Sequence, residues 1–171
     1  MAGITHGFVS GIADGADTTL VRPVDWNATH AGLTIVRKTA DEIVNNSIVL
    51  QNDDHLLMAV AANEIWDLDI LIRITATAVA DFKFTFVVPT AATLKGNTYY
   101  DVGRLQVALD LAATQSVLFG VDRADDFHGL KAVYVGGANA GNIQLQWAQN
   151  TAEVSDTKVL ADSCLIAHKL A

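Results

Sequence analysis

The amino-acid sequence predicts an all-β fold, a β-sandwich or jelly roll, that follows an extended N-terminal arm. Three observations lead to this prediction. Apolar and polar residues alternate along most of the chain after residue 33, which is the pattern of strands that bury one face. Clusters of glycine, asparagine and aspartate separate the alternating segments and mark turns. No amphipathic helix of adequate length separates the strands, so a parallel α/β sheet is not expected.

The arm comprises residues 1–33, and the sandwich domain residues 34–171. Glycine recurs at every fourth position from residue 3 to residue 15, and this density raises the entropy cost of a helix. Pro23 favours an extended backbone at the residue before it. The arm is nevertheless apolar, with Ile12 and Trp26 among its side chains. Extended segments with apolar side chains usually bury them on another molecule, so we expect the arm to attach the protein to a partner.

Weak alternation predicts short strands at residues 34–38, 47–51 and 55–60. The strongest pattern follows at residues 66–75, where the apolar positions are Trp66, Leu68, Ile70, Ile72 and Ile74. A strand places these side chains on one face, whereas a helix would scatter them. Asp67 and Asp69 then fall on the solvent face.

The next strand, residues 82–88, directs Phe82, Phe84 and Phe86 inward and ends at Pro89. Because only a short connection precedes it, we expect it to form a hairpin with the strand at 66–75.

In the second half of the chain, residues 142–150 alternate Ile143, Leu145 and Trp147 with polar residues. A glycine-rich turn precedes them, so we expect this strand to pair with residues 130–135. The other strands are expected at 99–102, 105–113, 116–121, 157–161 and 164–170. Residues 105–113 also fit a helical stripe, although the strand is preferred. About eight to ten strands at this spacing are typical of a sandwich or jelly roll.

The composition excludes several classes of function. The formal net charge is −8 and the basic residues are scattered, so a nucleic-acid-binding surface is not expected. No apolar run reaches the ~18–20 residues of a membrane helix, and the first residues lack the features of a secretory signal. The single cysteine, Cys164, excludes an internal disulfide. Hydrophobic residues make up 51% of the chain and the mean hydropathy is +0.29, which suggests that an oligomer buries further apolar surface.

No arrangement of side chains is typical of an enzyme or a cofactor site. Cys164 and His168 would lie about 13 Å apart along a strand, too far for a thiolate–imidazole pair. Acidic residues beside His55 and His128 leave metal binding as a minor alternative, but both clusters are expected in solvated turns. We therefore expect a non-enzymatic protein without a cofactor.

Gln144 and Gln146 point away from the core side of their strand, which carries Trp147. An uncharged face with amide groups suits a subunit interface, and it leaves open a carbohydrate-binding site.

Three stretches together resemble a family of small virion proteins of tailed bacteriophages and prophages. The most distinctive is Pro23–Ala28, within residues 20–30, and the others are residues 81–89 and 143–150. The first stretch is similar to an N-terminal element of phage tail-fibre and minor structural proteins, and the others to the β-domain that accompanies it. The resemblance covers most of the chain.

The resemblance implies a virion component, assembled in the bacterial cytoplasm, whose partners are further copies of itself and other virion proteins. The preferred role is a trimeric capsid decoration (cement) or head-spike protein that docks on the major capsid protein through its arm. Alternatives are a tail fibre or fibre adaptor, which would contact tail components, and a host-glycan-binding jelly-roll module. The expected attachment residues are Leu20, Val21, Arg22, Pro23, Asp25 and Trp26.

Overall fold

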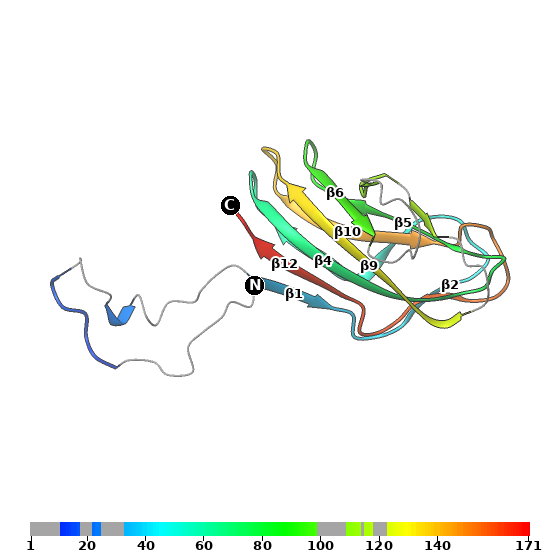
Figure 1. Ribbon diagram of the computed structural model, residues 1–171, viewed down its shortest axis with the longest axis horizontal. Helices are drawn as coiled ribbons and strands as arrows, with labels where there is room; N and C mark the ends of the chain where they lie inside the picture. Colours follow the sequence, from blue (N-terminus) through cyan, green and yellow to red (C-terminus); the bar gives the residue numbers. More distant parts are fainter. Residues whose placement is uncertain (1–10, 18–21, 25–32, 99–108, 114, 118–122) are drawn as a thin grey trace.

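The computed structural model describes residues 11–17, 22–24, 33–98, 109–113, 115–117 and 123–171. Twelve strands lie in these ranges (Figure 1). They are β1 (Leu33–Arg37), β2 (Glu42–Val44), β3 (Gln51–Val60), β4 (Ile65–Ala76), β5 (Phe82–Val87), β6 (Thr93–Thr98), β7 (Leu109–Asp110), β8 (Gln115–Val117), β9 (Arg123–Val135), β10 (Gly141–Ala148), β11 (Thr157–Val159) and β12 (Cys164–Lys169). The described residues include no helix long and apolar enough to cross a bilayer.

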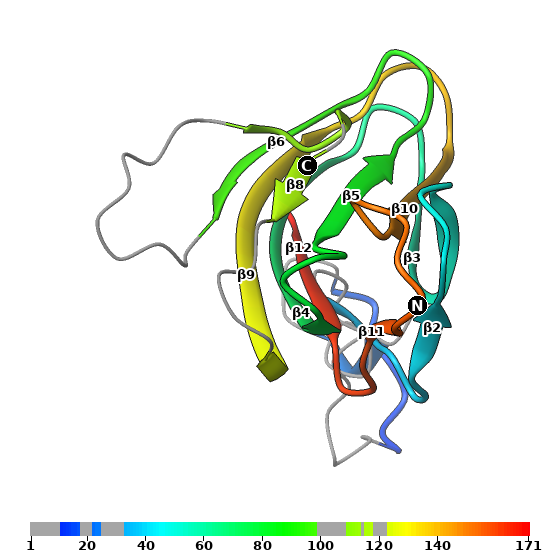
Figure 2. The ribbon, with the colours of Figure 1, turned by 90° about the vertical axis from the view of Figure 1, so that its right-hand side faces the viewer.

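The strands form two antiparallel sheets that face each other, which confirms the predicted all-β sandwich. The larger sheet has eight strands, with the order β1-β12-β4-β9-β6-β7, and β11 and β2 extend it beside β4. The smaller sheet has the order β3-β10-β5-β8. Figure 2 shows β9, β4 and β12 in one layer and β5, β10 and β3 in the other. Apolar side chains from both inner faces fill the space between the layers.

The alternating positions predicted to face inward are the core of the protein. Every second residue of β4 is buried, from Trp66 to Ala76. From the opposite sheet, Trp147 stacks on Phe82 with 5.9 Å between ring centroids. Phe84 and Phe86 continue this aromatic row with an edge-to-face contact at 6.1 Å. Period-two alternation therefore identified the buried face of these strands correctly.

Both predicted hairpins are wrong, because in each case the two strands belong to different sheets. β4 pairs with β12, β9 and β11, whereas β5 pairs with β10 and β8. Likewise β9 pairs with β4 and β6, whereas β10 pairs with β3 and β5. The glycine-rich turn between β9 and β10 packs against other turns: Gly136 donates to the carbonyl of Glu64 at 2.8 Å, and Asn63 donates to the carbonyl of Gly137 at 2.8 Å. Each connection therefore crosses from one sheet to the other.

Several boundaries also differ from those predicted. Residues 53–55, expected in a turn, belong to β3, and Asp125–His128, also expected in a turn, belong to β9. β2 and β6 were not predicted, because they carry little alternation. The predicted strand at 99–102 and part of those at 105–113 and 116–121 lie outside the described residues.

The described residues of the N-terminal arm are exposed or partly exposed. Every residue from 11 to 17 is exposed, including Ile12, and Val24 is exposed as well. The backbone NH of Val24 donates to the Oδ1 atom of Asp14 at 2.9 Å. In Figure 1 these segments are drawn in blue, apart from the strands. The first strand of the sandwich begins at Leu33, where β1 pairs with His168 of β12.

Candidate functional site

Gln144 and Gln146 lie on the outer face of the smaller sheet, as predicted. Their neighbours in the register form two rows across three strands: Leu57–Gln144–Val87 and Asn52–Gln146–Thr85. We call these six residues the glutamine face. None of them is charged, and Leu57 and Val87 are exposed. Depletion of charge with exposed apolar side chains is typical of the centre of a protein–protein interface.

A β-bulge lies at the edge of the glutamine face. Gln144 pairs with Leu57, and Gln146 pairs with Asn52. Between these two pairs, β3 spans five residue positions and β10 spans only two. The Nε2 atom of Gln144 donates to the carbonyl of Asp53, inside the bulge, at 2.9 Å, and to the carbonyl of Leu145 at 3.0 Å. The Nε2 atom of Gln146 donates to the Oδ1 atom of Asn52 at 2.8 Å. Both amides therefore hold the two strands together as well as facing outward.

Trp147 and Gln149, near the end of β10, offer no groups to a carbohydrate on this face. Trp147 is fully buried, so its ring offers no stacking surface for a sugar. Gln149 is also buried, and its amide donates to the carbonyls of Glu153 and Ser155 at 3.0 and 2.8 Å. The Oε1 atom of Gln149 accepts from the backbone NH of Ser47 at 3.1 Å. Gln149 therefore stabilises the loop that contains Glu153 and Ser155. No aromatic ring of β10 lies on the glutamine face.

The outer face of the larger sheet differs because it carries many charges. Lys131 on β9 lies between two carboxylates of β4, with its Nζ atom 2.8 Å from Asp67 Oδ2 and 2.9 Å from Asp69 Oδ2. Both hydrogen bonds raise the pKa of Lys131, and the one to Asp67 has the larger effect. Arg73 pairs with Asp125 on the same face. Asp67 and Asp69 therefore lie on the solvent face, as predicted, and share one ammonium group.

Of the attachment residues expected in the arm, only Arg22 and Pro23 fall within the described residues. Leu20, Val21, Asp25 and Trp26 lie outside them. The proposed role of these six side chains stays a prediction.

The candidate metal ligands and the thiol have separate surroundings. No group of three His, Cys, Asp or Glu side chains in the described part of the chain could hold a metal ion. Cys164 is half-buried on β12, and burial raises the pKa of its thiol. His168 is exposed on the same strand and is not a core residue.

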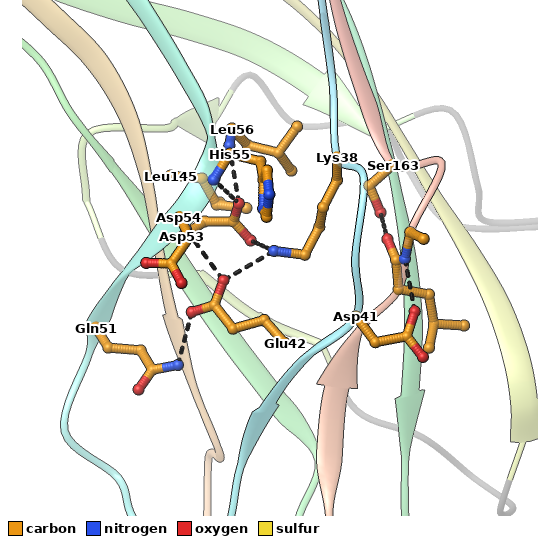
Figure 3. Close-up of polar contacts among 12 residues, drawn as sticks. Lys38, Asp41, Glu42, Gln51, Asp53, Asp54, His55, Leu56, Leu145 and Ser163 are labelled. Carbon is orange, nitrogen blue, oxygen red and sulfur yellow. Dashed lines mark hydrogen bonds and ion pairs between the residues drawn. The ribbon is translucent and has the colours of Figure 1, made fainter.

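A buried cluster of charges lies between the two sheets, and the sequence pattern does not predict it. Lys38 follows β1 and is fully buried, with its Nζ atom 2.7 Å from Asp53 and 2.8 Å from Glu42 (Figure 3). The sequence does contain a hint of this burial. Lys38 comes two residues after Val36, which packs against the core, so a continued strand would direct both side chains to the same face. A lysine at an inward position needs a buried partner, since an unpaired buried charge is very costly.

No family model and no curated protein matches this sequence. Among solved structures, the chain is similar to Eiger TNF from S. frugiperda, with 11% identity, a TM-score of 0.39, and coverage of 82% of this chain and 94% of that chain. It is also similar to the tripod (BppUct-A-L) from the baseplate of bacteriophage Tuc2009, with 10% identity, a TM-score of 0.37, and coverage of 98% and 77%. The structure of infectious bursal disease virus Gx strain gives 10% identity, a TM-score of 0.22, and coverage of 99% and 49%. At these values the similarities assign neither a family nor a function.

Proposed function

We propose that this chain is a non-enzymatic structural protein of a bacteriophage virion, which oligomerises through its sandwich and docks on the particle through its N-terminal arm. The more specific proposal is a capsid decoration or head-spike protein, with a homotrimer as the assembled form. A tail fibre or fibre adaptor is the second candidate, because the segment at Pro23–Ala28 is similar to an element of such proteins.

The observation that supports docking by the arm is the exposure of its apolar side chains. Ile12 and Val24 both lie in solvent, so the sandwich of the same chain does not bury them. Burying a side chain of this size contributes about 1.5–3 kcal/mol. A row of such anchors on a repetitive particle would give avidity through multivalent contact. The described residues before Leu33 therefore add nothing to the core of the sandwich and remain available for attachment.

The presence of the chain in purified virions, and its copy number there, test this function. Quantitative mass spectrometry of purified particles is expected to find the chain in a fixed ratio to the major capsid protein. Hundreds of copies per particle would support decoration of the head, since the shell is built from a large number of equivalent sites. A handful of copies would favour the tail. Absence from purified virions would refute both placements.

A charge on the glutamine face is expected to break the oligomer. Val87→Glu would bury an unpaired carboxylate in an uncharged interface, at a cost of about 3 kcal/mol or more per contact. Size-exclusion chromatography with light scattering should then report a monomer.

Val133→Glu provides the matched control, because Val133 and Val87 are 42% and 45% exposed and both lie on strands. Val133 belongs to the charged face of the larger sheet, so this variant should keep the mass of the wild type. If Val133→Glu dissociates and Val87→Glu does not, the interface lies on the larger sheet.

A further inference from the structure

The buried cluster joins the two sheets through one lysine and one aspartate. Lys38 extends from the end of β1, in the larger sheet, and Asp53 belongs to β3, in the smaller sheet. The Nζ atom of Lys38 lies 2.7 Å from the Oδ2 atom of Asp53, and both side chains are 0% exposed. Glu42, at 14% exposure, brings its Oε2 atom to 2.8 Å from the same Nζ atom. Figure 3 shows the three side chains converging.

Backbone hydrogen bonds orient the Asp53 carboxyl group. Its Oδ1 atom accepts from the backbone NH groups of His55 and Leu56, at 2.9 and 2.8 Å. The bulge in β3 creates this arrangement, and Gln144 supports it by donating to the carbonyl of Asp53. Bulges commonly redirect a side chain in this way. As a result Oδ1 faces two NH donors, while Oδ2 faces the lysine.

The other two members of the cluster are equally fixed. The backbone NH of Lys38 donates to the carbonyl of Ser163 at 2.8 Å, and its carbonyl accepts from Asp162 at 2.9 Å. The carboxylate of Glu42 accepts from the backbone NH of Asp54 at 3.0 Å and from the Nε2 atom of Gln51 at 2.9 Å. The amine and the Asp53 carboxyl group are therefore held together out of water, with the largely buried Glu42 carboxylate beside them.

We propose that Lys38 and Asp53 condense spontaneously to form an intramolecular isopeptide bond, with Glu42 as the proton relay. A proton first moves from the Lys38 ammonium to the Oδ2 atom of Asp53, which leaves a neutral amine and a neutral carboxylic acid. The Nζ atom then attacks the Cγ atom, and negative charge develops on Oδ1. Glu42 takes a proton from Nζ and delivers it to the Oδ2 hydroxyl. The Cγ–Oδ2 bond breaks, one water molecule leaves, and Glu42 is again a carboxylate.

Three features of the site favour this reaction. The NH groups of His55 and Leu56 point at the oxygen on which charge develops, which is the arrangement of an oxyanion hole. The amine and the acid are held in contact, so the entropy cost of bringing them together is already met by folding. Burial also penalises the charged pair, and the amide product removes both of those charges. The product covalently joins the end of β1 in the larger sheet to β3 in the smaller sheet.

Lys131 is an internal control for the role of burial. Its Nζ atom lies 2.8 and 2.9 Å from the carboxylates of Asp67 and Asp69, so these distances match those in the buried cluster. The Lys131 side chain is 39% exposed, however, and water can solvate this trio. An unlinked Lys131 beside a linked Lys38 would show that contact alone is not sufficient.

Intact-mass spectrometry of the denatured, purified wild-type protein tests the bond. The expected mass is lower than the mass of the sequence by one water molecule, and digestion should yield a branched peptide that joins Lys38 to Asp53. The full mass of the sequence would overturn the proposal. A water loss that maps to Asp14-Gly15 would also overturn it, because that dipeptide can form a cyclic imide with the same change in mass.

Variants assign the roles within the cluster. Glu42→Gln keeps the shape and most hydrogen bonds of the side chain but cannot relay a proton, so this protein is expected to show no water loss. Lys38→Arg keeps a buried cation but removes the amine nucleophile. This variant should therefore have the full mass of its sequence, with no loss of water. A Glu42→Gln protein that is fully linked would overturn the relay role of Glu42. Lys131→Arg should leave the water loss of the wild type intact.

Discussion

Removal of residues 1–31 is expected to abolish binding of the protein to phage particles while the sandwich stays folded and oligomeric. The deletion ends before Leu33, where β1 begins to pair with β12, so every strand and core residue found in the described part of the chain remains. It does remove every apolar anchor of the arm. Co-sedimentation of the truncated protein with particles that lack it should find no bound protein. Circular dichroism should still show a β-sheet protein, and light scattering should report the same number of subunits as in the full-length protein.

A single substitution in the arm should show the same effect in part. Trp26→Ala is expected to weaken binding by about 2 kcal/mol, roughly 30-fold, because a tryptophan that fills a pocket is often the main contributor to an interface. Val154→Ala is the control, since Val154 is 76% exposed on the sandwich and outside the arm. A truncated protein that still decorates particles would show that the sandwich, and not the arm, provides the attachment.

Trp147→Ala is expected to lower the free energy of unfolding by about 3 kcal/mol, near the lower end of the usual cost for a buried aromatic residue. The ring is fully buried and stacks on Phe82, so truncation leaves a large cavity between the sheets. The Nε1 atom is buried without a hydrogen-bond partner among the described residues, and its removal offsets part of the loss. Chemical denaturation of the purified oligomer at fixed protein concentration measures the difference.

Two further variants separate cavity formation from the loss of the indole nitrogen. Trp147→Phe keeps an aromatic ring against Phe82 and removes the unpaired NH, so it should cost less than Trp147→Ala. Val154→Ala, on the surface, should change the free energy of unfolding by less than about 0.5 kcal/mol. A Trp147→Ala protein as stable as the wild type would mean that this ring contributes little to the packing of the core.

Much of the candidate interface could be predicted from local pattern. Gln144 and Gln146 alternate with Ile143, Leu145 and Trp147, and this alone placed the amides outside and the apolar side chains inside. The sequence could not show that Leu57 and Val87 flank Gln144, because they come from strands far apart along the chain. An interface is a property of neighbouring strands, and their order depends on tertiary structure.

The buried cluster was harder to foresee. Asp53, Asp54 and His55 look like a solvated turn, because acidic residues are favoured there. In the folded protein a bulge in β3 turns Asp53 inward while Asp54 stays exposed, and Lys38 arrives from the opposite sheet. Lys38 and Asp53 are 15 positions apart and belong to different sheets, so no local sequence pattern predicts their contact.

The amino-acid sequence was sufficient to establish the all-β class, the face that each strong strand buries and the unusual character of the N-terminal segment. These properties follow from period two, from turn residues and from glycine density, all of which act over a few residues. The folded structure decided which strands pair, and it separated β4 from β5 and β9 from β10 into opposite sheets. It also brought Lys38 to Asp53. The physical reason is that alternation records only which side of a strand is apolar, whereas pairing and burial depend on how the connections cross between layers.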